Sequence, residues 1–203
     1  MTAATDDDPY DALGPGEEVP LARTPLSHAA LRNVLTIGHK EATGNDITPA
    51  RLRASWAMIG VESNGEAGGV RGAERIPGWS VWNFNLGNIS AALKVDGSAW
   101  QGDWALLTAH ENIGAGRDVT QRIRVHSSAI AGASDYWTCL LARFPSAVAA
   151  MDRGDLDGMS DKLPGLALAL KLGEGKGAYM TATAIEYAAG LVAWARVYDA
   201  RLT

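Results

Sequence analysis

A single helix with a carboxyl group at its end constrains this chain more than any other feature. Thr48 followed by Pro49 is typical of a helix N-cap with proline at the first helical position. Apolar residues then recur at helical spacing and predict one buried stripe, formed by Leu52, Trp56 and Ile59. Glu62 follows Ile59 by three residues, so it continues this stripe at the helix end. The sequence therefore predicts a core helix whose last turn carries a glutamate on its apolar side.

The position of Glu62 suggests a chemical role. Burial disfavours the charged form of a carboxyl group and raises its pKa. A carboxyl group at the apolar end of a helix would keep its proton near neutral pH, as a general acid must. On helix position alone, a glutamate that turns outward into water fits equally well, so the sequence downstream of the helix has to be considered.

Two segments, separated by residues 66–81, carry a family resemblance. They are Ile-Gly-Val-Glu-Ser-Asn-Gly at 59–65 and Trp-Asn-Phe-Asn-Leu-Gly-Asn-Ile at 82–89. Together they resemble peptidoglycan hydrolases of the glucosaminidase type, which belong to the lysozyme-like superfamily. The resemblance implies that Glu62 is the general acid, that Ser63 beside it contacts substrate, and that residues 82–89 line a sugar cleft. It favours the catalytic interpretation of Glu62.

The segment between these motifs predicts a loop and a sugar-binding wall. Residues 64–72 are too rich in glycine for a regular element, so we expect a loop beside the cleft. Trp79 and Trp82 are candidates for stacking on sugar rings, whereas Phe84 is expected in the core. Short amide groups suit hydroxyl and acetamido groups, and they are supplied by Asn83, Asn85 and Asn88. Gly87 indicates a positive φ angle or a close approach of the backbone to substrate.

Between residues 106 and 126 the hydrophobic period changes from helical to two, which predicts a β-hairpin. The turn is expected at 114–116. Glu111 occupies the face that its strand otherwise makes apolar, an environment that would perturb a carboxyl group. An edge-strand glutamate paired with Arg122 or Arg124 explains the pattern equally well.

The resemblance extends over roughly residues 45–200. Segments 107–111 and 123–128 resemble the family hairpin, which makes Glu111 the match to its second carboxylate. Residues 133–136 resemble an Asp-Tyr helix start, and Tyr179 matches a tyrosine that faces the catalytic glutamate in the family. The chain departs from the family pattern at Asn64-Gly65, in the spacing before Glu111, and at His126, which replaces a tyrosine.

The remaining pattern predicts a helical scaffold. Thr24-Pro25 indicates a helix start, and that helix is expected to close near Gly44. A further helix is expected from Ser134 to Pro145, followed by helices at about 145–151, 156–163 and 164–172. Thr183 with Glu186 forms a capping box before a long C-terminal helix, whose predicted stripe is Ile185, Leu191, Val192, Ala195, Tyr198 and Leu202.

Length and composition predict one domain with a tail. A chain of 203 residues that is 47% hydrophobic can bury one sizeable core. Residues 1–23 are acidic and rich in glycine and proline, so we expect a flexible tail there, either merely solvated or docking to an export or virion partner. Residues 24–203 are expected to form the domain. The predicted class is mainly α (α+β), a lysozyme-like helical domain with a small β-hairpin lobe flanking the cleft.

Several classes of function are disfavoured. A net charge of −5 gives no electrostatic basis for binding nucleic acid, and no apolar run spans a membrane. The four histidines are scattered, so neither a metal site nor a cofactor is expected, and the single Cys139 fits a small core residue. We expect synthesis in the cytoplasm without a Sec signal, with action on the cell wall in the periplasm after phage or specialised delivery.

The function expected from the resemblance is cleavage of β-1,4 bonds in the glycan strands of peptidoglycan, with Glu62 as acid. Three routes for the second participant stay open: Glu111 activates water, the acetamido group of the substrate acts as nucleophile, or a hydroxyl group of the adjacent sugar closes on itself, as in lytic transglycosylases, which need one carboxyl group only. A non-catalytic structural or binding component of a phage or secretion machine is the alternative of a different class. The sequence does not select which bond is cut.

Overall fold

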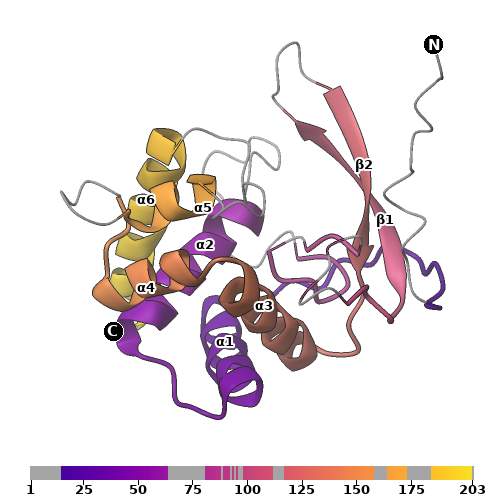
Figure 1. The fold of residues 1–203 in the computed structure, drawn as a ribbon, viewed down its shortest axis with the longest axis horizontal. Helices are drawn as coiled ribbons and strands as arrows, with labels where there is room; N and C mark the ends of the chain where they lie inside the picture. Colours follow the sequence, from indigo (N-terminus) through magenta and orange to yellow (C-terminus); the bar gives the residue numbers. More distant parts are fainter. Residues whose placement is uncertain are drawn as a thin grey trace.

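The structure is a computed structural model of the chain, and it describes residues 15–63, 81–87, 89–91, 93, 95, 98–111, 117–157, 164–172 and 184–202. In these ranges it contains six helices and one two-stranded sheet. The helices pack together, and the hairpin stands beside them as a separate lobe (Figure 1). No helix within these ranges is long and apolar enough to cross a bilayer. The predicted class, mainly helical with a small hairpin, is confirmed.

Helix α2 (Pro49–Ser63) is the central helix. Its predicted N-cap is confirmed, because the hydroxyl oxygen of Thr48 accepts the N–H of Arg51 at 3.1 Å. Every residue from 54 to 59 is buried, so the helix is enclosed on all sides and not only along the predicted stripe. Helices α1, α4 and α6 pack against it. Its last turn therefore places Glu62 at the edge of the core.

Helix α1 (His28–Thr43) begins three residues later than the Thr24-Pro25 signal predicts. The N-cap is Ser27, whose side chain accepts the N–H of Ala30. Thr24 serves another purpose, since its hydroxyl oxygen accepts the N–H of Phe84 at 2.8 Å and so joins the N-terminal segment to the loop at 81–87. The predicted C-terminus is confirmed, with Gly44 as a left-handed cap at φ 74°.

Helix α3 (Ala129–Arg143) starts earlier than predicted. Ser128 is the N-cap and accepts the N–H of Ala131, whereas Ser134, the predicted start, lies inside the helix. Gly132 is needed for packing in the first turn, because a Cβ there would lie 1.8 Å from the carbonyl oxygen of Phe84. The start was therefore misplaced because a glycine that serves close packing resembles a helix breaker.

The helical lobe is completed by three helices that follow α3 in the chain: α4 (Pro145–Arg153), α5 (Leu166–Leu172) and α6 (Ala184–Leu202). The predicted helix at 156–163 falls mostly on residues 158–163, which lie outside the described ranges. Helix α6 starts where the capping box predicts, although Thr183 itself is not described. Its predicted stripe is wrong at Ile185, which is 83% exposed. The buried residues are Tyr187, Ala188, Leu191, Trp194, Ala195 and Tyr198.

The predicted hairpin is confirmed as β1 (Trp104–Glu111) and β2 (Arg117–Arg124). The strands are antiparallel, with Trp104 opposite Arg124 and Glu111 opposite Arg117. Ala105, Leu107 and Ile123 form a small apolar cluster of this lobe. The expected turn at 114–116 lies outside the described residues.

The base of the hairpin is held by chain segments on both edges. Val19 N–H donates to the carbonyl of Trp104, and Trp104 N–H donates to the carbonyl of Glu17. On the other edge, Ala91 N–H donates to the carbonyl of Arg122. Val19 and Leu21 also pack on the hairpin's apolar cluster. Residues 15–23, which were expected in a flexible tail, thus bond to the domain, whereas residues 1–14 are not described and the division at residue 23 stays a prediction.

Candidate active site

Close packing of α2 against α6 creates the environment of Glu62. The two helices run antiparallel, since Arg53 near the start of α2 bonds Asp199 near the end of α6. Two glycines bring the backbones together at the other end. A Cβ on Gly60 would lie 2.5 Å from the Trp194 ring, and one on Gly190 would lie 3.1 Å from Val61. This contact brings the first turns of α6 beside the last turn of α2.

Tyr187 of α6 donates its hydroxyl proton to Oε1 of Glu62 at 2.6 Å. A second tyrosine approaches from α3, where the Tyr136 hydroxyl donates to the sulfur of Met58 at 3.6 Å. Met58 precedes Glu62 by four residues and so lies on the same side of α2. The end of α2 is therefore flanked by phenolic hydroxyl groups from two other helices.

Burial raises the pKa of Glu62 from 4.5 to about 7, and the hydrogen bond from Tyr187 opposes that rise. The carboxyl group is surrounded by protein, but the residue as a whole keeps partial exposure. In the part of the chain that the structure describes, no charged side chain contributes to this shift. The carboxyl group is thus about half protonated near neutral pH, because burial outweighs the hydrogen bond from Tyr187.

The hydrogen bond also determines which oxygen can deliver a proton. Oε1 accepts from Tyr187, so the acidic proton is expected on Oε2. Within the described ranges no group is hydrogen-bonded to Oε2. A protonated oxygen at the partly exposed end of a buried helix has the arrangement that a general acid requires.

Several predicted site residues cannot be compared with this geometry. Trp79, Asn88 and Tyr179 lie outside the described residues, and Ser63 is described only as the last residue of α2. Glu111 is described only as part of β1. In the backbone register Glu111 lies opposite Arg117, whereas Arg122 and Arg124 lie opposite Leu106 and Trp104. The proposed role of Glu111 stays a prediction.

The loop at 81–87 shows how the predicted binding residues are used. Asn83 and Phe84 have φ values of 49° and 55°, and Asn85 N–H donates to the carbonyl of Trp82 at 2.8 Å, as in a type I′ turn. The Asn83 amide bonds Ala22 and Pro20 at 2.9 and 3.1 Å. This amide therefore fixes the N-terminal segment to the loop.

Asn85 also hydrogen-bonds to groups of the protein itself. It is 1% exposed, and its amide bonds the backbone of Ile89 in both directions and the carbonyl of Arg124. Trp82 is half-buried, with the Arg23 guanidinium 4.8 Å from its ring centre. The amides of Asn83 and Asn85 and the ring of Trp82 thus contact other groups of the protein, and the expected contact of these residues with a sugar stays a prediction. The positive φ expected for Gly87 is confirmed at 80°.

Sequence reasoning missed Tyr187 and Tyr136 as neighbours of Glu62. A periodic signal was available for Tyr187, since steps of four and three residues back from Tyr198 lead through Trp194 and Leu191 to it. Tyr136 was noted only as part of a helix-start motif. Tyr187 reaches Glu62, and Tyr136 reaches Met58 one turn before it, through packing of helices that are distant in sequence, which local patterns do not encode.

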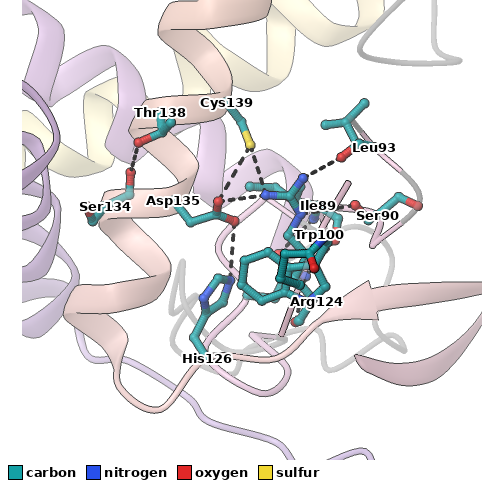
Figure 2. A network of polar contacts seen from close by, with 12 residues as sticks. Ile89, Ser90, Leu93, Trp100, Arg124, His126, Ser134, Asp135, Thr138 and Cys139 are labelled. Atoms are coloured by element: carbon teal, nitrogen blue, oxygen red, sulfur yellow. Dashed lines mark hydrogen bonds and ion pairs between the residues drawn. The ribbon is translucent and has the colours of Figure 1, made fainter. Parts of the chain in front are cut away.

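A second polar cluster lies where the hairpin meets α3 (Figure 2). The Arg124 guanidinium is 3% exposed, donates to Asp135 Oδ1 at 2.7 Å, and lies 4.8 Å from the ring centre of Trp100. It also donates to the carbonyls of Ser90 and Leu93. His126 Nε2 lies 3.4 Å from the other Asp135 oxygen. This cluster joins β2, the loop at 89–93 and α3.

The remaining titratable residues fit structural roles. Burial raises the pKa of the Cys139 thiol to about 12, so it is a poor nucleophile. His39 is buried, contacts Asn45 and Arg51, and has a pKa lowered mainly by burial. No group of three potential metal ligands occurs among the residues that the structure describes.

Comparisons with known proteins give the following result. No protein-family model matches the sequence, and no curated protein matches it either. Two structures of the glycoside hydrolase domain of FlgJ from Salmonella typhimurium are similar to this chain, each with 19% sequence identity over 86% of its length. The C-terminally truncated form is matched over 99% of its own length with a TM-score of 0.44. The other form is matched over 90% of its own length with a TM-score of 0.45. A mutant peptidoglycan hydrolase from Sphingomonas sp. A1 is 22% identical, over 78% of this chain and 92% of that one, with a TM-score of 0.43. At such low TM-scores these likenesses do not assign the chain to a family.

Proposed function

We propose that this protein is a glycosidase that cuts β-1,4 bonds in the glycan strands of peptidoglycan, with Glu62 as the general acid. The observation that carries the proposal is a carboxyl group with a pKa of about 7 at the partly exposed end of a buried helix. The Glu-Ser motif and the 82–89 segment, which resemble glucosaminidase-type enzymes, give the substrate class.

The proposed reaction begins with proton transfer from Glu62 to the glycosidic oxygen. As the bond between the anomeric carbon and that oxygen breaks, the leaving sugar departs as an alcohol and positive charge develops on the anomeric carbon. Glu62 becomes a carboxylate, which the Tyr187 hydroxyl stabilises by its hydrogen bond. A nucleophile then adds to the anomeric carbon and completes the reaction.

The source of that nucleophile separates two mechanisms. Glu111 could activate water as a base, which in an inverting enzyme lies about 6.5 to 9.5 Å from the acid. Alternatively the substrate supplies its own acetamido or hydroxyl group, as in a single-acid lytic transglycosylase. Among the described residues Glu62 bonds Tyr187, and the side chain of Glu111 is not described, so the released products have to separate the two mechanisms.

The decisive experiment is Glu62→Gln, which keeps the shape of the side chain and removes its proton. We expect lysis of purified peptidoglycan to fall by at least about 10²-fold, the usual scale for loss of a general acid. Glu41→Gln, at an exposed position of α1, is the matched control and should keep full activity. Wild-type lysis by Glu62→Gln would show that Glu62 is not the general acid, whereas absence of lysis by the wild-type protein itself would support a non-catalytic structural or binding role.

Mass spectrometry of the released glycan identifies the bond and the mechanism together. Reducing-end N-acetylglucosamine, reducing-end N-acetylmuramic acid and an anhydro sugar differ in mass or reducibility. In parallel, Glu111→Gln should abolish most hydrolysis, with partial rescue by azide, if Glu111 is the base. A fully active Glu111→Gln that releases anhydro sugars would establish the transglycosylase.

A further inference from the structure

The Tyr136 hydroxyl has an unusual hydrogen-bond partner. The side chain is 1% exposed, and its hydroxyl donates to the thioether sulfur of Met58 at 3.6 Å. A thioether is a weak acceptor, and a buried phenol normally finds an oxygen. Met58 and Glu62 occupy successive turns on one side of α2, about 6 Å apart along the axis. A better acceptor is therefore available one turn away.

We propose that Tyr136 is a positioning residue for Glu62: its hydroxyl rests on Met58 while the carboxyl group is protonated and turns towards the carboxylate once the proton has left. This inference rests on the proposed function of Glu62 as an acid. It assigns two tyrosines to one carboxyl group, with Tyr187 bonded in both protonation states and Tyr136 only in the charged one.

Such an arrangement would favour proton transfer. A donor that bonds the carboxylate and not the protonated acid stabilises the transition state, in which charge develops, more than the ground state. Burial raises the pKa of Tyr136, and negative charge on Glu62 raises it further, so the two groups lie within electrostatic reach. The titratable groups that face Glu62 in the described ranges are Tyr187 from α6 and Tyr136 from α3.

The test is a titration of Glu62 in the free protein, followed by NMR with ¹³C-labelled glutamate and assigned with Glu62→Gln. Tyr136→Phe removes the donor and keeps the ring in the core. We expect the pKa of Glu62 to rise by about one pH unit, the scale of one hydrogen bond to a charged group. Tyr198→Phe, a buried tyrosine 11 residues beyond Tyr187 on α6, is the matched control and should leave the pKa unchanged.

Met58→Leu provides a second variant with the opposite expected sign. Without the sulfur, Glu62 is the acceptor that we expect the Tyr136 hydroxyl to take among the described residues, so the pKa of Glu62 should fall. In the double variant Tyr136→Phe/Met58→Leu that fall should vanish, because the effect of Met58 acts through the hydroxyl. A merely structural role for Tyr136 would give neither the opposite signs nor the coupling.

The inference is overturned if Tyr136→Phe leaves the pKa of Glu62 unchanged, or if the double variant keeps the full effect of Met58→Leu. This titration needs no substrate, so it separates the inference from the proposed activity. For the active enzyme we expect Tyr136→Phe to lower kcat about 10-fold with KM unchanged, since the hydroxyl bonds the acid and not the sugar. A change confined to KM would also overturn it.

Discussion

The protein buries two carboxyl groups in opposite ways. Asp135 lies between helix α3 and the hairpin, where Arg124 donates to one oxygen and His126 lies near the other. Glu62 lies at the end of α2, where its hydrogen bond comes from a neutral tyrosine and burial raises its pKa to about 7. A buried carboxyl group that faces an arginine becomes a fixed structural anion, whereas one that lacks a cation keeps a proton that it can transfer.

The two regions have different roles in the protein. The cluster around Arg124 collects a carboxylate, two backbone carbonyls and an aromatic ring around one guanidinium, and it holds the hairpin against α3 (Figure 2). The Glu62 region carries an unfavourable buried carboxyl group that the packing of α2 and α6 has to support. The cluster around Arg124 therefore stabilises the fold, whereas the buried carboxyl group of Glu62 destabilises it.

Arg124→Met should have the largest effect on stability. It leaves Asp135 buried without its cation, so we expect a loss of about 3 to 5 kcal/mol in the free energy of unfolding, the usual cost of breaking a buried ion pair. Urea unfolding followed by circular dichroism measures it. A loss below about 1 kcal/mol would show that Asp135 is supported without Arg124, and the contrast between the two carboxyl groups would fail.

Glu62→Gln should act in the opposite direction. The folded protein raises the pKa of Glu62 from 4.5 to about 7, so the folded state binds more protons than the unfolded state between these values. Wild-type stability contributed by this group is therefore complete below about pH 4.5 and lost as pH rises through about 7. We expect the variant to be more stable than wild type by up to about 3 kcal/mol at about pH 8, and by little at about pH 4.5.

This prediction is measured by urea unfolding of both proteins at the two pH values. The sign is the critical feature, because loss of an ordinary hydrogen bond to Tyr187 would make the variant less stable at every pH. A Glu62→Gln variant that is inactive and more stable above pH 7 would show that the carboxyl group is kept for activity at a cost in stability. If the variant and the wild-type protein were equally stable at both pH values, the pKa of Glu62 would be the same in the folded and the unfolded state.

The sequence predicted the elements of the fold better than the use of their polar side chains. Helix α2 followed from the period of Leu52, Trp56 and Ile59, although the helix is buried on every side and not only along that stripe. Asn85 resembled a ligand for sugar, but it bonds Ile89 and Arg124, because an amide bonds whichever backbone groups the fold brings near. A short local pattern contains no information on that choice.

The same reason explains why Tyr187 was missed and why helix starts were misplaced. Tyr187 meets Glu62 across 125 residues of sequence, through the glycine contacts of α2 and α6. Thr24 has the residue type of an N-cap but bonds Phe84, and Ser27 caps α1. Competing uses of one hydroxyl group are decided by tertiary contacts, which are absent from a local signal.

Gly87→Val tests the loop between the two regions. Gly87 has a φ of 80°, which a β-branched residue adopts only at a cost, so we expect a loss of about 1 to 2 kcal/mol. Gly44→Val has a similar φ of 74° with no atom near the added Cβ, and it is the matched control. Both variants should lose stability in urea unfolding, but only Gly87→Val should lower peptidoglycan lysis. Equal peptidoglycan lysis by the two variants would show that residues 82–89 do not form the cleft wall.

The smallest effect is expected for Arg53→Met, which separates burial from the ion pair itself. Arg53 bonds Asp199 through two contacts of 2.7 Å, with the same chemistry as Arg124 and Asp135, but the two side chains are 32% and 45% exposed. Exposed pairs contribute about 0.2 to 1 kcal/mol, so urea unfolding should show at most that loss. The pair also joins α2 to α6, the helices that carry Glu62 and Tyr187. Because Gly60 and Gly190 already fix the approach of these helices, peptidoglycan lysis should stay at the wild-type rate. A fall in lysis at unchanged stability would show that this ion pair sets the register of α6 and thereby the contact between Tyr187 and Glu62.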